Sequence, residues 1–300
     1  MRVLIIGAGG FLGAHVRRQA ESVGIEVVTA GRSPLPDSPR HATLDLSTDD
    51  PRAIEAVLQS VAPEVVVNCA GATTGSSEVL EGANITGPGA LTRTMLIAGP
   101  PVRLVHLGSA AEYGLTEPGV PVSESAIPQP VGEYGATKLA GTRLVEQAAA
   151  AGLDAVVLRV FNPIGSGASE QSLPGRVMAE VRRALAQGTD VRLGPLEAAR
   201  DFVDARDVAD AVIAAATAPT LPHRVLNRGS GVGTPARTLV KELVSISGYA
   251  GEVHEDLPGS SRSAGVLWQQ ADITAATRDL AWQPRRDLVT SLTDWWEEIR

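Results

Sequence analysis

The chain opens with the stretch Val3-Leu4-Ile5-Ile6-Gly7-Ala8-Gly9-Gly10-Phe11-Leu12-Gly13, a short apolar run followed at once by glycines. The apolar run is typical of a buried parallel strand, and a helical pattern begins directly after the glycines. Gly7 is expected to form the tight turn, Gly10 to let a pyrophosphate approach the backbone, and Gly13 to let helix and strand pack closely. Because a helix N-terminus attracts phosphate, the stretch predicts a dinucleotide-binding turn rather than an ordinary βα connection.

From this turn outward, short apolar runs alternate with helical patterns, as in a doubly wound parallel sheet. Further strands are expected at residues 25–30, 43–46, 63–68, 102–107, 155–160, 191–193 and 224–227. Helices are expected at residues 51–61, 84–98, 133–151, 173–187, 206–218, 236–247, 273–280 and 287–299. The alternation becomes irregular after Val160. The predicted fold is therefore α/β, a Rossmann-type doubly wound parallel sheet with a smaller, discontinuous C-terminal substrate-binding lobe.

The predicted division of the chain follows from this irregularity. Residues 1–160 are expected to form the dinucleotide-binding domain, to which residues 201–228 return. Residues 161–200 and 229–300 are expected to form the substrate-binding lobe.

Charge and composition exclude several classes of protein. The net charge of −8 and the pI near 5.2 argue against nucleic-acid or anionic-membrane partners. Cys69 is the only cysteine, so no intrachain disulfide can form, which is typical of a reducing compartment. No stretch approaches the roughly 20 apolar residues of a membrane span. The histidines lack the spacing of metal ligands, and His106 is interpreted as a packed residue inside a strand. We therefore expect a cytoplasmic protein without a metal site.

Residues at the ends of three predicted strands indicate how a cofactor would bind and which one is favoured. Arg32 follows the second strand, where an acidic residue would bind the ribose 2′-hydroxyl of NAD and an arginine accommodates the 2′-phosphate of NADP. Unless it is a solvated loop residue, Arg32 favours NADP(H), with NAD less favoured. Asp45 ends the third strand and is expected either to bind the adenine amino group or to cap the helix at 51–61. Cys69-Ala70-Gly71 follow the fourth strand and are small enough for a cofactor to lie over them, with the sulfur as a packing group.

A pair of residues further on indicates acid–base chemistry. Tyr134 and Lys138 are four residues apart, so on a helix they lie on the same face. A nearby ammonium favours the phenolate and lowers the pKa of a tyrosine from its ordinary value of roughly 10. Alone, this pair would more often be an exposed helical pair. Ser109 changes the interpretation, because it follows a parallel strand at the edge where ligands bind in open α/β sheets.

Several further motifs resemble those of one family over essentially the whole chain. They are Asn68-Cys69-Ala70-Gly71, Gly108-Ser109-Ala110-Ala111-Glu112-Tyr113-Gly114, Phe161-Asn162-Pro163-Ile164-Gly165, Arg200-Asp201-Phe202-Val203-Asp204 and Asp279-Leu280-Ala281-Trp282-Gln283-Pro284. With Tyr134 and Lys138, they resemble the extended short-chain dehydrogenase/reductase family, and within it the nucleotide-sugar epimerase/dehydratase/reductase branch. In the last motif Ala281 stands where the family has glycine.

The resemblance implies roles for these residues. Ser109 would hydrogen-bond the reacting sugar oxygen, Tyr134 would exchange the proton, and Lys138 would hold the nicotinamide ribose. The implied cofactor contacts are Gly7, Gly10, Phe11, Leu12, Gly13, Arg32, Asp45, Leu46, Cys69, Ala70, Gly71, Tyr134, Lys138 and Phe161. The implied substrate contacts are Ser109, Ala110, Tyr134, Asn162, Val177, Arg200 and Arg262.

Some of these positions keep two interpretations. Asn162 and Arg262 would hold the diphosphate, although Arg262 lies in a polar loop and could be solvated. Arg200 is expected either to reach the nucleotide or to form a salt bridge. Tyr113 is expected to line the sugar site or to pack in the core. The four tryptophans, Trp268, Trp282, Trp295 and Trp296, are expected to pack.

The resemblance also narrows the reaction. Dehydratases of this branch carry a Thr-Asp-Glu run whose carboxylates perform the elimination, whereas this chain has Ser109-Ala110-Ala111. Epimerases and decarboxylases recycle a tightly held NAD, so Arg32 favours a net reductase that draws on NADPH. The expected activity is reduction of the C4 ketone of a nucleoside-diphosphate 4-keto-6-deoxyhexose in deoxysugar synthesis.

Two alternatives stay open beside the reductase. One is a 4-epimerase of nucleoside-diphosphate sugars with tightly bound NAD. The other is a non-catalytic nucleotide-binding regulator, although such proteins usually lose the tyrosine or the lysine. A homodimer through the helices at about 84–98 and 133–151 is expected from the family.

Overall fold

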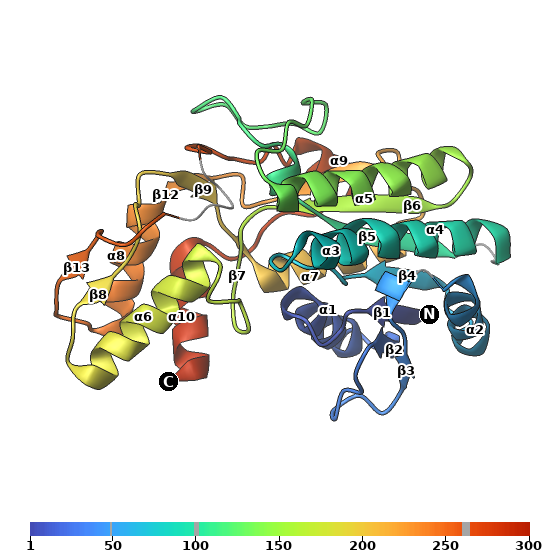
Figure 1. Cartoon of the computed structure of the whole chain (residues 1–300), viewed down its shortest axis with the longest axis horizontal. Helices are drawn as coiled ribbons and strands as arrows, with labels where there is room; N and C mark the ends of the chain where they lie inside the picture. The colour runs from blue at the N-terminus through green and yellow to red at the C-terminus, as the bar shows by residue number, and fades with distance from the viewer. Residues whose placement is uncertain (49, 99–101, 260–264) are drawn as a thin grey trace.

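A seven-stranded parallel sheet forms the centre of the molecule (Figure 1). The computed structural model describes residues 1–48, 50–98, 102–259 and 265–300. From one edge to the other, the strands are β3 (His41–Thr43), β2 (Glu26–Gly31), β1 (Arg2–Ile6), β4 (Val65–Asn68), β5 (Arg103–Ser109), β6 (Ala155–Val160) and β11 (Val225–Arg228). All six pairings are parallel. The strand order reverses between β1 and β4, as in doubly wound sheets, which confirms the predicted fold class.

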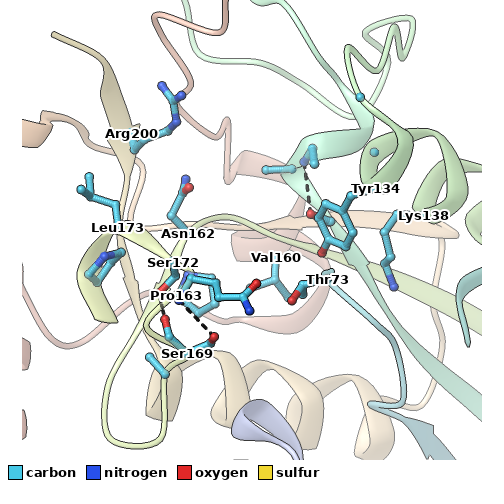
Figure 2. A pocket seen from close by; sticks show the side chains of 18 of the residues that line it. Thr73, Tyr134, Lys138, Val160, Asn162, Pro163, Ser169, Ser172, Leu173 and Arg200 are labelled. Carbon is cyan, nitrogen blue, oxygen red and sulfur yellow. Dashed lines mark hydrogen bonds between the residues drawn. The ribbon is translucent and has the colours of Figure 1, made fainter. Parts of the chain in front are cut away.

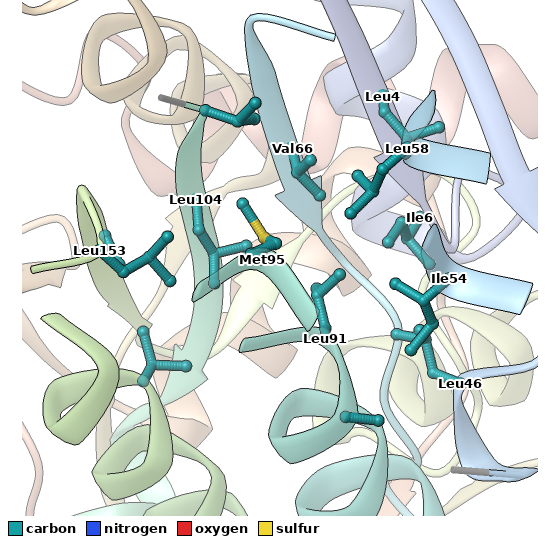
Figure 3. Packing of buried hydrophobic residues seen from close by; sticks show 14 of the residues in the cluster. Leu4, Ile6, Leu46, Ile54, Leu58, Val66, Leu91, Met95, Leu104 and Leu153 are labelled. Atoms are coloured by element: carbon teal, nitrogen blue, oxygen red, sulfur yellow. The ribbon is translucent and has the colours of Figure 1, made fainter. Parts of the chain in front are cut away.

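Helices cover both faces of this sheet because successive residues of each strand point to opposite faces. On one face, Leu4 and Ile6 of β1 belong to a hydrophobic cluster with residues of α2 (Pro51–Val61), α4 (Gly87–Ala98) and α5 (Glu133–Ala150), as Figure 3 shows in part. On the other face, Val3 and Ile5 pack with residues of α1 (Phe11–Ser22) and α7 (Ala205–Thr217). β1 is therefore buried on both sides, as its continuous apolar run predicted.

Two predicted elements differ most from their bounds in the structure. The strand expected at 43–46 ends at Thr43, because the Asp45 carboxylate accepts the backbone N–H and hydroxyl of Ser47 and starts a 3₁₀ turn at Leu46–Thr48. The helix expected at 84–98 begins earlier, as α3 (Ser77–Glu81), and passes through a π-helical turn at Gly82–Thr86 before α4. Such π-helical turns are frequent at functional sites.

A third, smaller hydrophobic cluster lies beyond the carboxyl edge of the sheet. It packs α6 (Leu173–Gln187), α8 (Ala236–Ser247) and α10 (Leu288–Ile299) around residues such as Val181, Leu239 and Trp295. Three short strand pairs flank it: β7 (Pro163–Ile164) with β10 (Val203–Asp204), β8 (Val191–Arg192) with β13 (Val253–His254), and β9 (Ala199–Asp201) with β12 (Gly233–Pro235). Between these segments the chain returns to the main sheet, where α7 packs on α1 and β11 pairs with β6.

Candidate active site

A cavity of about 610 Å³ lies at the carboxyl ends of the central strands, between the sheet and the smaller lobe. Gly10 after β1, residues 69–73 after β4 and Ser109 at the end of β5 line one side. Leu173 at the start of α6 and Pro195 after β8 line the other. The cavity therefore spans the point where the strand order reverses, which is where open α/β sheets bind ligands.

The glycine turn has the geometry that its spacing predicts. Gly7 has a φ of +80°, and a Cβ there would lie 2.7 Å from the backbone nitrogen of Ala70. A Cβ at Gly13 would lie 2.2 Å from the carbonyl oxygen of Gly7, so α1 packs against the strand end without space for a side chain. Both glycines serve chain packing, and neither lines the cavity. Gly10 does line it, together with Phe11 and Leu12.

This end of the cavity fits the pyrophosphate of a dinucleotide. Gly10 is the N-cap of α1 and provides no capping side chain, and a Cβ there would meet one atom, the Gly7 oxygen at 3.3 Å. The first N–H groups of a helix without a side-chain cap are available to an anion. Next to them, Cys69, Ala70 and Gly71 form a wall of small residues. Burial raises the pKa of the Cys69 thiol to about 12, so the sulfur stays protonated at neutral pH.

Tyr134, Lys138 and Ser109 reach the same cavity from two elements. Tyr134 and Lys138 lie one turn apart on α5, and both face the cavity in Figure 2. The Lys138 ammonium is buried and donates to the carbonyl oxygen of Leu107 at 2.6 Å. Burial lowers the pKa of Lys138 below its ordinary value. Ser109 is the N-cap of a 3₁₀ turn, its hydroxyl oxygen accepting the N–H of Ala111 at 3.2 Å.

His106 lies behind this group and is not a cavity residue. It is fully buried within β5, and its ring lies 3.2 Å from the Asn68 side-chain nitrogen. Burial, followed by the nearby Lys138 charge, lowers the pKa of His106 well below its ordinary value, so the ring is neutral at pH 7. The interpretation of His106 as a packed residue is confirmed.

Asn84, which the sequence analysis did not select, also lines the cavity. It lies in the π-helical turn, and its amide bonds both backbone groups of Ala72, at 3.0 Å and 2.9 Å, and the hydroxyl of Thr137 at 3.1 Å. These bonds join the loop after β4 to the first turn and a half of α5. The signal in the sequence was a single asparagine within a glycine-rich helical segment, which is not distinctive by itself.

The opposite wall of the cavity presents cations and amides. Figure 2 shows Asn162 and Arg200 across from Tyr134 and Lys138. The Asn162 amide donates to the Asp201 carbonyl oxygen at 3.2 Å. Arg200 is largely buried and donates to the carbonyl oxygens of Ala199 and Val266, at 2.8 Å and 2.7 Å. No described carboxylate pairs with Arg200. Among the described residues, its position therefore fits the interpretation that it reaches the nucleotide better than the interpretation that it forms a salt bridge.

Arg176 is a further cavity cation that sequence analysis missed. It lies on the first turn of α6, half-buried, and its guanidinium has no hydrogen bond or ion pair within the described part of the chain. Among the described lining residues, none is Asp or Glu. The cavity is therefore electropositive through Lys138, Arg176 and Arg200, which suits an anionic ligand.

Several residues selected from the sequence lie elsewhere. Phe161 and Val177 are fully buried in two hydrophobic clusters and do not line the cavity, because strand β6 and helix α6 turn these positions into the core. Arg32, Asp45 and Leu46 lie beyond the cavity, near the ends of β2 and β3. Arg262 falls outside the described residues.

The ends of β2 and β3 lie close to each other. The Ser47 hydroxyl holds the pKa of the Asp45 carboxyl below its usual value, and the exposed Arg32 guanidinium acts in the same direction. Asp45 does not cap α2, since Asp50 does so by accepting the N–H groups of Arg52 and Ala53. The capping alternative for Asp45 was wrong.

The aromatic residues belong mainly to the core. Tyr113 is 2% exposed and donates to the Asn227 side-chain oxygen at 2.7 Å, so it packs and does not line the sugar site. Trp282, Trp295 and Trp296 are buried, as expected.

The described residues offer neither a membrane span nor a cluster of metal ligands. None of their helices combines the length and apolar character needed to cross a bilayer. Within the same residues, no group of three or more His, Cys, Asp and Glu side chains is placed to hold a metal ion.

Comparisons with known proteins agree with this arrangement. Residues 3–229 match the model of the NAD dependent epimerase/dehydratase family. A dTDP-6-deoxy-L-talose 4-dehydrogenase (NAD(P)(+)) from Kitasatospora kifunensis is 37% identical over 301 residues, covering 98% of this chain and 94% of the relative. A UDP-glucose 4-epimerase from Streptomyces lividans is 28% identical over 323 residues, covering 99% and 95% of the two chains.

A solved structure gives the same result at the level of the fold. MoeE5 in complex with UDP-glucuronic acid and NAD superposes with a TM-score of 0.86 at 27% identity, covering 100% of both chains. That complex holds a nicotinamide dinucleotide and a sugar nucleotide, the two kinds of ligand that the glycine turn and the electropositive cavity fit. Together with the family match over most of the chain, these findings establish that the protein belongs to the NAD-dependent epimerase/dehydratase family, the nucleotide-sugar branch of the extended short-chain dehydrogenases/reductases.

Proposed function

We propose that the protein is a C4 oxidoreductase that reduces a nucleoside-diphosphate 4-keto-6-deoxyhexose with NADPH. One observation carries this proposal: Tyr134, Lys138 and Ser109 share a cavity whose described lining contains no Asp or Glu. Elimination of water from a sugar needs an acid and a base besides the tyrosine. Ala110 and Ala111, which follow Ser109 on the cavity wall, supply neither. The site therefore suits hydride and proton exchange at one carbon.

The most informative relative supports the position of that carbon. The Kitasatospora protein is named a 4-dehydrogenase of dTDP-6-deoxy-L-talose, and its oxidation run backwards is the reduction of a 4-keto-6-deoxyhexose. The same name allows NAD or NADP as cofactor. For this chain we propose the NADP pair, because Arg32 replaces the acidic residue expected at the end of β2 in an NAD-binding fold.

Each residue of the acid–base group has a defined task in this reaction. When bound, the nicotinamide supplies the hydride that adds to C4. Tyr134 gives its hydroxyl proton to the C4 oxygen as that oxygen becomes negative. Ser109 donates a hydrogen bond to the same oxygen, and the Lys138 ammonium stabilises the phenolate that remains on Tyr134. Because Lys138 is buried, its charge acts in a medium of low dielectric constant and is weakly screened.

The other wall holds the nucleotide. We propose that Arg176, Arg200 and Asn162 bind the diphosphate, which arginine suits through its planar fork of donors. Arg200 is already held by two backbone carbonyls, so little side-chain freedom is lost when an anion binds. Arg262, the other arginine expected at the diphosphate, stays a prediction. The homodimer through α4 and α5 also stays a prediction; α4 presents Ile97 with 87% of its surface exposed.

The test is an assay with purified protein, NADPH and a panel of 4-keto-6-deoxyhexoses linked to different nucleotides. Stoichiometric oxidation of NADPH with formation of the 4-hydroxy sugar supports the reductase. Isomerisation of a sugar nucleotide without net cofactor oxidation would instead support a 4-epimerase, the alternative that the Streptomyces relative favours. Binding of cofactor and sugar without any turnover would indicate a non-catalytic regulator and contradict the proposal.

A further inference from the structure

Glu112 is completely buried directly behind the cavity wall that Ser109 forms. Its Oε1 accepts the backbone N–H of Ser109 at 2.7 Å, and the Ser109 hydroxyl oxygen accepts the N–H of Ala111. The two side chains thus close a capping box around a single 3₁₀ turn. Because the backbone of Ser109 is held by this carboxylate, Glu112 sets the direction in which the serine presents its hydroxyl.

The far end of Glu112 is anchored to the sheet. Its Oε2 accepts the Nε–H of Arg159 on β6 at 2.8 Å, and that side chain is only 4% exposed. The Arg159 guanidinium lies over the Tyr113 ring, 4.7 Å from its centroid. A Cβ at Gly108 would lie 2.7 Å from Glu112 Oε1, so the carboxylate occupies the space that this glycine leaves open. The arrangement leaves Glu112 little freedom to move.

Stability does not account for this buried pair. Removing two charges from water costs several kcal/mol per ion, and well-packed apolar residues of similar volume are often as stabilising or more so. An apolar pair would also fill this part of the core, which already holds Tyr113 and Phe161. We therefore expect the carboxylate to act on its neighbours, Ser109 and Lys138.

Lys138 and Glu112 hold the same strand end. The Lys138 ammonium donates to the carbonyl oxygen of Leu107 at 2.6 Å, and Glu112 Oε1 accepts the N–H of Ser109, two residues further along β5. The titratable and charged groups around this pair in the described part of the chain include Cys69, His106, Tyr134 and Arg159, which forms an ion pair with Glu112. The thiol and the imidazole are neutral at pH 7, because burial raises the pKa of Cys69 and lowers that of His106. Burial lowers the pKa of Lys138, and among the described groups Glu112 opposes this effect most strongly.

We propose that Glu112 is a positioning residue of the acid–base centre, which fixes Ser109 through its backbone and keeps the buried Lys138 ammonium charged. The inference rests on the proposed function, in which Lys138 acts as a cation and Ser109 as a hydrogen-bond donor. It adds a residue that touches neither substrate nor cofactor and acts through two residues that do.

The composition of the chain allows a direct test. Lys138 and Lys241 are the only lysines, and Lys241 is exposed on α8. A ¹³C-labelled lysine sample therefore gives two signals, one of which is an internal reference, and each can be titrated with and without saturating NADP⁺. Replacing Glu112 by glutamine removes the negative charge, so the pKa of Lys138 is expected to fall by about half a unit or more, as measured against the Lys241 reference signal.

Two further variants separate the effect of the Glu112 charge from the effects of its side-chain length and of protein stability. Glu112→Asp keeps the charge but is shorter by one methylene, so Lys138 should titrate as in the wild type while kcat falls about tenfold. Asp207→Asn is the matched control: this carboxylate is also fully buried and pairs with Arg286 at 2.6 Å, but it lies outside the cavity. It should lower the unfolding temperature and leave the Lys138 titration where it is.

The proposal is overturned if folded Glu112→Gln gives the wild-type titration of Lys138. Should this variant not fold, E112Q/R159M is compared with R159M alone, so that the two proteins differ only at residue 112 and the loss of the Arg159 charge is common to both. The titration needs no sugar substrate. A failure of the proposed function would show as no turnover by the wild type, whereas a failure of this inference would show as an unmoved lysine pKa.

Discussion

Two glycines of the first turn, Gly13 and Gly10, are predicted to respond to the same substitution in opposite ways. In Gly13→Ala the new Cβ would lie 2.2 Å from the Gly7 oxygen and 2.9 Å from the Ala8 Cα, both backbone atoms. Since neither can turn aside as a side chain does, α1 or the strand end must shift by about 1 Å to restore ordinary contacts. Overpacking of this kind costs about 1–3 kcal/mol, from which the better helix propensity of alanine recovers at most about 1 kcal/mol.

The corresponding change in melting temperature follows from the size of the chain. An unfolding entropy of about 2.1 cal/mol/K per residue gives roughly 0.6 kcal/mol per kelvin for 300 residues. A net loss of about 2 kcal/mol therefore lowers the melting temperature by about 3 °C. Gly10→Ala needs a shift of only a few tenths of an ångström, because its Cβ would lie 3.3 Å from the Gly7 oxygen, and its φ of −78° suits alanine.

The methyl group of Gly10→Ala would stand on the wall where we place the pyrophosphate. We expect this variant to melt within about 1.5 °C of the wild type and to bind NADPH about tenfold more weakly. Differential scanning fluorimetry measures the first quantity and NADPH fluorescence titration the second. A Gly13→Ala protein as stable as the wild type would refute the packing argument. A folded Gly10→Ala protein with wild-type affinity would refute the assignment of the phosphate site.

Three further predictions concern the cavity and the adenosine end. Tyr134→Phe should reduce kcat about 100-fold or more with little change in NADPH affinity, because only the proton donor is lost; wild-type turnover in steady-state assays would rule out its acid–base role. Arg32→Ala should weaken NADPH binding by about 1–2 kcal/mol without affecting NADH, as measured by titration with both cofactors, and an equal loss for the two would remove the argument for NADP. Cys69, whose pKa burial raises to about 12, should react with iodoacetamide at pH 8 far more slowly in the folded protein than in urea, and equal rates followed by mass spectrometry would contradict a thiol that the fold keeps protonated.

The local parts of the site could be predicted from the sequence. The glycine turn depends on spacing within seven residues, and the shared face of Tyr134 and Lys138 depends on one helical turn. Six of the seven strands of the sheet were identified because each reads as a short apolar run, whereas the third strand was expected at 43–46 and lies at His41–Thr43. In these cases the determining contacts lie within the element itself, so periodicity and turn chemistry suffice to predict them.

The remaining features depended on contacts between distant residues, which only the tertiary structure decides. Glu112 meets Arg159 across 47 positions, and Asn84 meets Thr137 across 53, so neither pairing leaves a periodic trace in the sequence. Phe161 and Val177 resembled ligand contacts by motif, but the packing of β6 and α6 turns both into the core. Sequence by itself determined the nucleotide-binding type of fold and the shared face of Tyr134 and Lys138. The packing of the sheet against the smaller lobe decided the rest. It determined which side chains face the cavity and which ones support them from behind, and it gave the described wall cations without carboxylates.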